Sequence, residues 1–150
     1  MIKYIDGDLI RDSDDYDVIL QGCNCHHIMG GGIALQIRTK FPEAYEADCK
    51  TKRSDKSKLG TISYTDVNNK PIIVNMYTQF DIGAYKTGGM DFDYMACKSA
   101  LQLVKKQFSG KKIGMPHIGS TLGGGDWTIT KRIIEEIMKD EDVTVVNYKP

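Results

Sequence analysis

The sequence predicts a three-layer α/β/α sandwich with a mixed central sheet. Two observations support this fold class. Short apolar runs alternate along the chain with segments whose apolar residues recur at helical spacing. In addition, two glycine-rich stretches, residues 22–34 and 117–125, each follow a predicted strand and lead into a predicted helix. Ligands of open α/β sheets bind at the carboxyl ends of strands, so we expect these two loops to enclose one ligand.

The first third of the chain is expected to contain two strands and two helices. Residues 2–5 and 16–21 are predicted strands, and the continuous apolar centre of the second is typical of a buried parallel strand. Apolar residues at helical spacing predict a helix over 33–41. Pro42 ends this helix and opens a short one over 43–51, because proline suits the first helical turn.

The middle of the chain is expected to form a hairpin and a long loop. Residues 59–64 and 71–77 are predicted strands, and the turn residues 67–70 between them favour an antiparallel pair. The following loop, residues 78–89, is rich in glycine and polar residues. Its length is sufficient for a mobile flap over a site.

The last third returns to alternating helices and strands. Residues 91–108 have helical spacing, with Asp91 or Asp93 as the candidate N-terminal residue. A strand is predicted over 112–116, an amphipathic helix after the second glycine-rich loop, and a closing strand over 143–146. No linker or internal repeat interrupts this order, so residues 1–150 are expected to be a single domain.

Composition narrows the class of protein. Hydrophobic residues make up 41% of the 150 residues, which is enough to build a core. Lysine and arginine total 20, and aspartate and glutamate also total 20, so the formal net charge is zero. A neutral chain does not favour nucleic acid as a partner, although residues 50–58 form a local basic stretch. No apolar run approaches the ~20 residues of a membrane span, and the N-terminus does not resemble a signal peptide. We expect a cytoplasmic monomer with no membrane partner and no cofactor.

The cysteines are expected to be reduced thiols, because nothing indicates secretion. Cys23 and Cys25 lie beside His26 and His27, and this group raises the alternative of a zinc site. Its spacing differs from that of structural zinc sites, and no second pair of ligands follows downstream. We therefore predict that the protein has no metal site.

The first glycine-rich loop has two interpretations. A helix start exposes unpaired backbone N–H groups and the positive end of the helix dipole. Gly30, Gly31 and Gly32 would let that backbone approach a phosphate-bearing molecule without hindrance from Cβ atoms. Alternatively, the glycines only shape a tight connection between strand and helix. The second loop of the same kind favours the ligand-binding interpretation.

Three motifs, taken together, resemble the macrodomain family. They are Gly7-Asp8-Leu9, the segment from Cys23-Asn24-Cys25 to Gly30-Gly31-Gly32-Ile33-Ala34, and Met115-Pro116-His117-Ile118-Gly119 running to Gly124-Gly125-Asp126-Trp127. The resemblance spans nearly the whole chain and keeps the order of the motifs. It is strongest for the branch that includes ADP-ribose-1″-phosphate phosphatases and terminal ADP-ribose protein glycohydrolases.

This resemblance implies a cleft for ADP-ribose. Asp8 and the backbone of Leu9 would contact the adenine, and Tyr148 would lie beside that base. The distal ribose would be held by Asn24, Gly30, Gly31, Gly32 and Ile33. The diphosphate would be cradled through the backbone N–H groups of Ser120, Thr121, Leu122, Gly123, Gly124 and Gly125. Structural alternatives remain: Asp8 only turns the chain, Asn24 only ends a strand, and Tyr148 only covers the sheet edge.

Catalysis is harder to assign. The glycohydrolases of this branch use a lysine in the loop after the middle strands and an aspartate in the second glycine-rich loop. Our alignment places Gln79 and Gly123 at these positions, and neither side chain can perform that chemistry. The remaining candidates are Asp126, to position or deprotonate water, and His26 or His27, to protonate a leaving group.

Each catalytic candidate also has a structural alternative, because Asp126 suits the N-cap of the next helix and the histidines could only fill the loop. Two functions from different classes therefore follow. The first is hydrolysis of ADP-ribose-1″-phosphate or of a related ester on the distal ribose. The second is a binding module that captures ADP-ribose or its conjugates without turnover. A further alternative is a hydrolase acting on ADP-ribosylated macromolecules.

Overall fold

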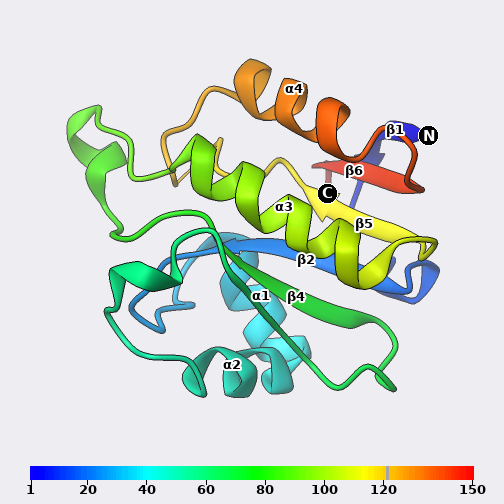
Figure 1. Cartoon of the computed structure of the whole chain (residues 1–150), viewed down its shortest axis with the longest axis horizontal. Helices are drawn as coiled ribbons and strands as arrows, with labels where there is room; N and C mark the ends of the chain where they lie inside the picture. Colours follow the sequence, from blue (N-terminus) through cyan, green and yellow to red (C-terminus); the bar gives the residue numbers. More distant parts are fainter. Residues whose placement is uncertain (121) are drawn as a thin grey trace.

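The computed structural model describes residues 1–120 and 122–150, and within these residues six strands form one sheet in the order β1-β6-β5-β2-β4-β3 (Figure 1). The strands are β1 (Ile2–Gly7), β2 (Val18–Cys23), β3 (Ile62–Tyr64), β4 (Ile72–Tyr77), β5 (Ile113–Pro116) and β6 (Val143–Tyr148). The α-helices are α1 (Gly32–Lys40), α2 (Pro42–Cys49), α3 (Tyr94–Phe108) and α4 (Trp127–Ile137). Short 3-10 helices are η1 (Ser13–Asp15), η2 (Lys56–Lys58) and η3 (Ala84–Thr87).

The predicted mixed sheet between two helical layers is confirmed. Neighbouring strands are parallel except for β3, which pairs antiparallel with β4 as the predicted hairpin, with Ile62 opposite Met76. In Figure 1, α3 and α4 lie on one side of the sheet and α1 on the other. Because five strands are parallel, their carboxyl ends meet at one edge of the sheet.

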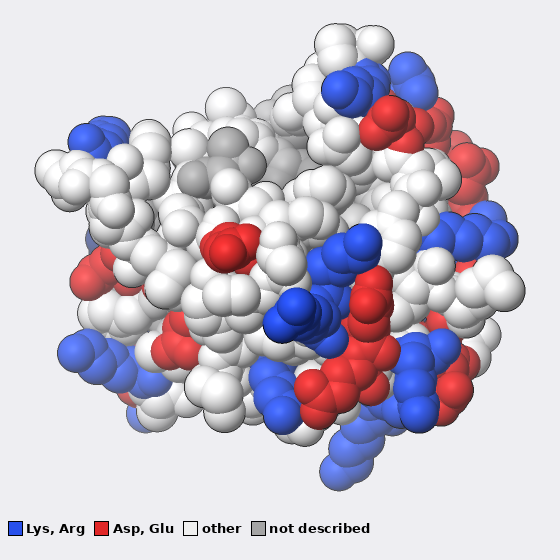
Figure 2. Space-filling view, turned by 90° about the horizontal axis from the view of Figure 1, so that it is seen from above, with Lys and Arg blue, Asp and Glu red and all other residues white. Residues whose placement is uncertain are grey.

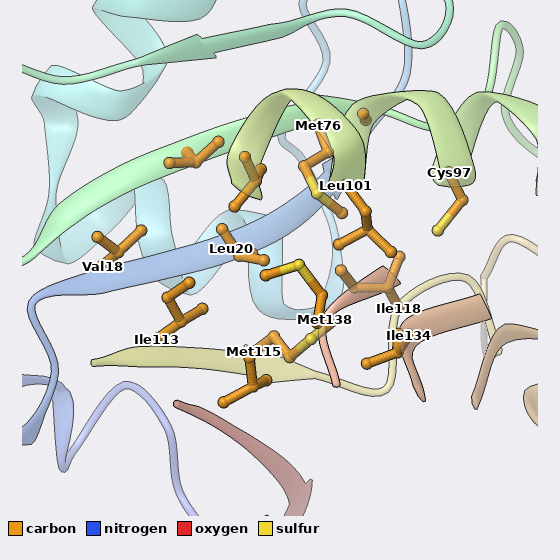
Figure 3. Packing of buried hydrophobic residues seen from close by; sticks show 14 of the residues in the cluster. Val18, Leu20, Met76, Cys97, Leu101, Ile113, Met115, Ile118, Ile134 and Met138 are labelled. Atoms are coloured by element: carbon orange, nitrogen blue, oxygen red, sulfur yellow. The ribbon is translucent and has the colours of Figure 1, made fainter. Parts of the chain in front are cut away.

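The core follows from the alternation of side chains along buried strands. Val18 and Leu20 of β2 pack with Leu101 of α3 in one apolar cluster, which Figure 3 shows from close by. Ile19, between them, faces the other way and packs with Ile37 of α1. A strand that is buried on both faces needs apolar residues at successive positions, which explains the continuous run in the sequence.

Some predicted boundaries were wrong by two or three residues. Strand β2 extends to Cys23, beyond the predicted residue 21, because its ladder with β4 continues to the pair Cys23 and Tyr77. The strand predicted to begin at residue 59 begins instead at Ile62, since Gly60 has a φ of +83°. Of the two candidate aspartates before α3, Asp93 is the N-cap, and its Oδ1 accepts a hydrogen bond from Ala96 N at 2.9 Å.

Candidate functional site

A cavity of about 890 Å³ opens at the carboxyl edge of the sheet. It is lined by residues that follow β1, β2, β4 and β5 and by residues at the end of β6. Parallel strands deliver these loops to one edge, so segments far apart in the sequence meet there. Of the predicted ligand-binding residues, the lining contains Asp8, Leu9, Asn24, Gly30, Gly31, Gly32, Ile33, Ser120, Leu122, Gly123 and Tyr148. Gly124 and Gly125 are not among its lining residues, and Thr121 lies outside the described residues.

Asp8 combines a structural role with a place in the cavity. Its Oδ1 accepts hydrogen bonds from Ile10 N at 3.1 Å and Arg11 N at 3.0 Å, which is the predicted turn. Within the described residues its Oδ2 accepts no hydrogen bond, so this oxygen can still accept one from a ligand. Tyr148, at the end of the neighbouring strand β6, is 60% exposed and also lines the cavity. A carboxylate and an exposed aromatic ring at one end of a cavity suit a flat base with an amino group.

Asn24 holds the first glycine-rich loop in shape. Its Oδ1 accepts a hydrogen bond from His26 N and its Nδ2 donates one to Ile28 O, both at 2.8 Å. Helix α1 begins at Gly32, and its N-cap is Gly31, which has no side chain to cap the first N–H groups. No side chain among the described residues caps the N–H groups at this helix start, so they can meet an anion.

The second glycine-rich loop packs tightly on the protein itself. Gly119 has a φ of +75°, and a Cβ there would overlap the ring of Phe92. Gly123 O accepts hydrogen bonds from Asp91 N and Phe92 N, both at 3.1 Å. Gly125 N in turn donates to Gly119 O at 2.6 Å. This loop is thus fixed to the residues before α3, and Gly123 remains in the cavity lining.

None of the three predicted catalytic side chains lines the cavity. His26 lies between Ser54 and Asp81, and the His27 Nε2 lies 3.0 Å from the Oγ1 of Thr51, two residues after α2. The Asp126 Oδ1 accepts a hydrogen bond from Thr128 N at 2.9 Å, so this residue is the N-cap of α4. These contacts agree with the structural alternatives, in which Asp126 caps a helix and the histidines fill the loop. The catalytic roles of Asp126, His26 and His27 stay predictions.

The cavity also contains polar side chains that sequence analysis did not assign to it. Gln79, Tyr85 and Lys86 come from the loop predicted as a flap, and all three line the cavity. The sequence could have indicated Lys86 as a cavity residue, because it is the one lysine of residues 78–89, the predicted flap. His117 also lines the cavity, stacked on Trp127 with 4.0 Å between ring centroids. Burial lowers the pKa of His117, which favours the neutral imidazole at neutral pH.

The cysteine-histidine group does not form a metal centre in the described part of the chain, where no cluster of three or more His, Cys, Asp or Glu side chains is placed to hold an ion. Cys23 and Cys25 are buried free thiols. Burial raises the pKa of Cys23 well above its ordinary value, so the thiol keeps its proton and is a poor ligand.

Charge on the outer surface is mixed. On the face shown in Figure 2, lysine and arginine side chains lie interleaved with aspartate and glutamate. Elsewhere in the described residues, Lys98 of α3 and Glu136 of α4 approach to 3.7 Å. Interleaved charges cancel at short range, so that face produces no broad positive field. In the described residues no helix is both long and apolar enough to cross a membrane.

Comparison with known proteins identifies the family. The chain matches the family description Macro domain over residues 20–134, and it therefore belongs to the Macro domain family. It is 30% identical to a protein of unknown function from Bacteroides thetaiotaomicron whose structure superposes with a TM-score of 0.84, covering 98% of both chains.

Its relatives differ in their named activities. The chain is 33% identical to an uncharacterised 17.5 kDa protein of Enterobacteria phage T4, covering 100% of this chain and 98% of the relative. It is 29% identical to the DNA ADP-ribosyl glycohydrolase of Mycobacterium tuberculosis. That match covers 100% of this chain but only 42% of the length of the relative. It is 24% identical to the ADP-ribose 1″-phosphate phosphatase of Saccharomyces cerevisiae, with 96% of this chain and 97% of the relative covered.

Proposed function

We propose that the cavity binds ADP-ribose and that the protein hydrolyses ADP-ribose-1″-phosphate or a related derivative substituted on the distal ribose. The observation that carries this proposal is a single cavity lined by both glycine-rich loops together with Asp8 and Tyr148. Its volume of about 890 Å³ falls within the ordinary range of small-molecule sites. Relatives named as ADP-ribosyl hydrolases and phosphatases support the same ligand class.

The cavity offers a complementary group for each part of ADP-ribose. The free oxygen of Asp8 can accept a hydrogen bond from the adenine amine, and the ring of Tyr148 can stack on the base. The N–H groups at the start of α1 and in the second loop suit the diphosphate, because backbone donors and a helix N-terminus both favour negative charge. Asn24 and Ile28 line the cavity in the first loop, where the distal ribose is expected.

Hydrolysis would use groups within the cavity. Lys86 lies in the lining and carries a positive charge that can stabilise the charge developing on a departing phosphate. His117, kept neutral by burial, can accept a proton from water when substrate and water are placed beside it. Both groups lie in the cavity, unlike Asp126, His26 and His27, so we assign them first priority for mutation.

Calorimetry with ADP-ribose tests the binding half of this proposal. We expect a dissociation constant in the micromolar range, and Tyr148→Ala should weaken it about tenfold through the loss of one stacked ring, worth about 1.4 kcal/mol. The absence of binding at millimolar ADP-ribose would overturn the assignment.

Release of free phosphate from ADP-ribose-1″-phosphate, compared between wild type, Lys86→Met and His117→Gln, tests the hydrolytic half. Binding without any release would select the non-catalytic module.

A second candidate function is removal of ADP-ribose from a modified macromolecule, and Lys86 is the observation that favours it. A lysine amine can attack the C1″ carbon of an opened ribose and form a Schiff base. Although Gln79 occupies the position aligned with the lysine of such hydrolases, Lys86 reaches the same cavity from η3. Trapping with cyanoborohydride should attach ADP-ribose covalently to wild type but not to Lys86→Arg. No adduct in wild type would remove this candidate.

A further inference from the structure

Outside the cavity, three side chains from separate segments form one hydrogen-bonded array. His26 follows β2, Ser54 lies in the loop after α2, and Asp81 lies in the loop after β4. The His26 Nδ1 lies 2.7 Å from Ser54 Oγ, and its Nε2 lies 2.8 Å from Asp81 Oδ1. The rings of His26 and Phe80 also pack edge to face, with 4.6 Å between centroids, which holds the imidazole in place.

The direction of each hydrogen bond follows from the available protons. When the His26 ring is neutral, its hydrogen lies on Nε2 and is donated to Asp81, because an ionised carboxylate can only accept. The Nδ1 of the neutral ring then carries a lone pair and accepts the hydroxyl hydrogen of Ser54. A serine that donates to an imidazole, which in turn donates to a carboxylate, has the arrangement of an activated nucleophile.

The backbone at Ser54 adds an independent observation. Ser54 has a φ of +60°, which is uncommon for a residue with a side chain, and it is exposed. Strained backbone at a serine nucleophile is known from sharp turns that present the hydroxyl to substrate, with the N–H of the next residue stabilising the oxyanion. Here the next N–H belongs to Asp55, and it forms no hydrogen bond within the described residues. The Asp55 carboxylate is engaged elsewhere, with Ser57 N at 2.8 Å.

We propose that Ser54, His26 and Asp81 form a second, acyl-transfer site that hydrolyses small carboxylic esters. Ser54 Oγ attacks the ester carbonyl carbon while His26 Nδ1 takes the hydroxyl proton, and the Asp55 N–H faces the oxyanion of the tetrahedral intermediate. The bond from the carbonyl carbon to the alcohol oxygen then breaks, and His26 gives its proton to the leaving alcohol. Water hydrolyses the acyl-serine by the same proton route, which releases a carboxylic acid and restores Ser54.

This site is separate from the proposed ADP-ribose cavity, since none of its three side chains lines that cavity. Its exposed serine suits a small acyl group, because a long chain would remain in water. Asp81 does not touch substrate; it is a positioning residue that holds the imidazole in the reactive tautomer. The array therefore predicts two activities that can be removed independently.

Labelling with a fluorophosphonate probe tests the proposal on the whole protein. Peptide mass spectrometry of labelled wild type should find the phosphonyl group on Ser54, and p-nitrophenyl acetate should be hydrolysed above the rate in buffer. Ser54→Ala should abolish both, and His26→Gln should lower the hydrolysis rate at least about 100-fold. The matched control is Ser57→Ala, at an exposed serine three residues further on in η2, and it should keep full labelling.

Asp81 needs a measurement that a purely structural role would not change. Asp81→Asn should lower kcat about tenfold with KM unchanged, and Asp81→Glu should restore part of it. All variants should keep the circular dichroism spectrum of wild type, which shows that they are folded. ADP-ribose binding is measured on wild type alone, so the fate of the cavity proposal is decided separately from this result. No label on Ser54 in wild type, or equal ester hydrolysis in wild type and Ser54→Ala, would overturn the proposal and leave the array as a link between three loops.

Discussion

The two glycine-rich loops contribute to one cavity, but Gly30 and Gly31 of the first differ from Gly119 and Gly125 of the second in what surrounds them. In the first loop, a Cβ at Gly30 would lie 4.0 Å from its nearest neighbour, and one at Gly31 would lie 3.6 Å from Leu122. In the second loop, a Cβ at Gly119 would overlap Phe92, and one at Gly125 would lie 2.8 Å from Gly119 O. Gly30 and Gly31 therefore leave room for a ligand, whereas Gly119 and Gly125 leave room for the protein itself.

The two loops also differ in what fixes their shape. Polar side chains hold the first loop, with Asn24 bonded within it, His26 bonded to Ser54 and Asp81, and His27 beside Thr51. Backbone contacts hold the second, through Gly123 O and the residues before α3. Two glycine-rich stretches can thus have unlike physical roles, and substitutions should separate them.

The largest effect is expected for Gly119→Ala in the second loop. The added methyl group would overlap Phe92 and impose a positive φ on alanine, which together should destabilise the fold by about 3 kcal/mol. Thermal unfolding should then show a melting temperature about 6–12 °C lower. Gly110→Ala is the matched control, because Gly110 has a φ of +85° but no atom within 4 Å of a Cβ. Equal losses in the two variants would mean that Phe92 contributes nothing.

Asn24→Ala should have the next largest effect, because it removes the side chain that shapes the first loop. Three hydrogen bonds, one of them long at 3.4 Å, are lost at a side chain that is 7% exposed, which should cost about 2 kcal/mol of unfolding free energy. Asn24→Asp keeps the acceptor for His26 N and should lose less. Chemical denaturation measures both variants. A smaller loss for alanine than for aspartate would contradict the role we give to this side chain.

Sequence reasoning recovered the fold because its signals are local. The apolar run Val18 to Leu20 and the turn residues 67–70 each determine the conformation of their own segment. The motif resemblance likewise placed most ligand-binding predictions on residues that line the cavity. The contacts of His26 could not be predicted, because Ser54 and Asp81 lie 28 and 55 positions away and only the folded chain brings them together. The sequence likewise did not indicate that glycines in residues 117–125 make room for Phe92, because only the folded chain brings Phe92 against them.

Gly31→Ala tests the first loop through ligand affinity. Gly31 has a φ of −146°, which alanine adopts freely, so the unfolding free energy should change by less than about 0.5 kcal/mol. The methyl group would enter the cavity lining and should weaken ADP-ribose binding about tenfold, or about 1.4 kcal/mol. Calorimetry on this variant and on Gly110→Ala, which lies away from the cavity, provides the comparison. Unchanged affinity in Gly31→Ala would show that the first loop does not approach the ligand.

The smallest effect is expected just beyond the second loop, at Asp126. This carboxylate caps α4 through Thr128 N and does not line the cavity, so Asp126→Ala should cost about 1 kcal/mol of unfolding free energy. Asparagine is an equally good N-cap, so Asp126→Asn should retain stability, ADP-ribose affinity and any phosphate release. Because this substitution removes the charge and keeps the cap, it separates the two roles. If Asp126→Asn melted like wild type but no longer released phosphate, the carboxylate would take part in the chemistry, and the second loop would be more than a packed support for the cavity.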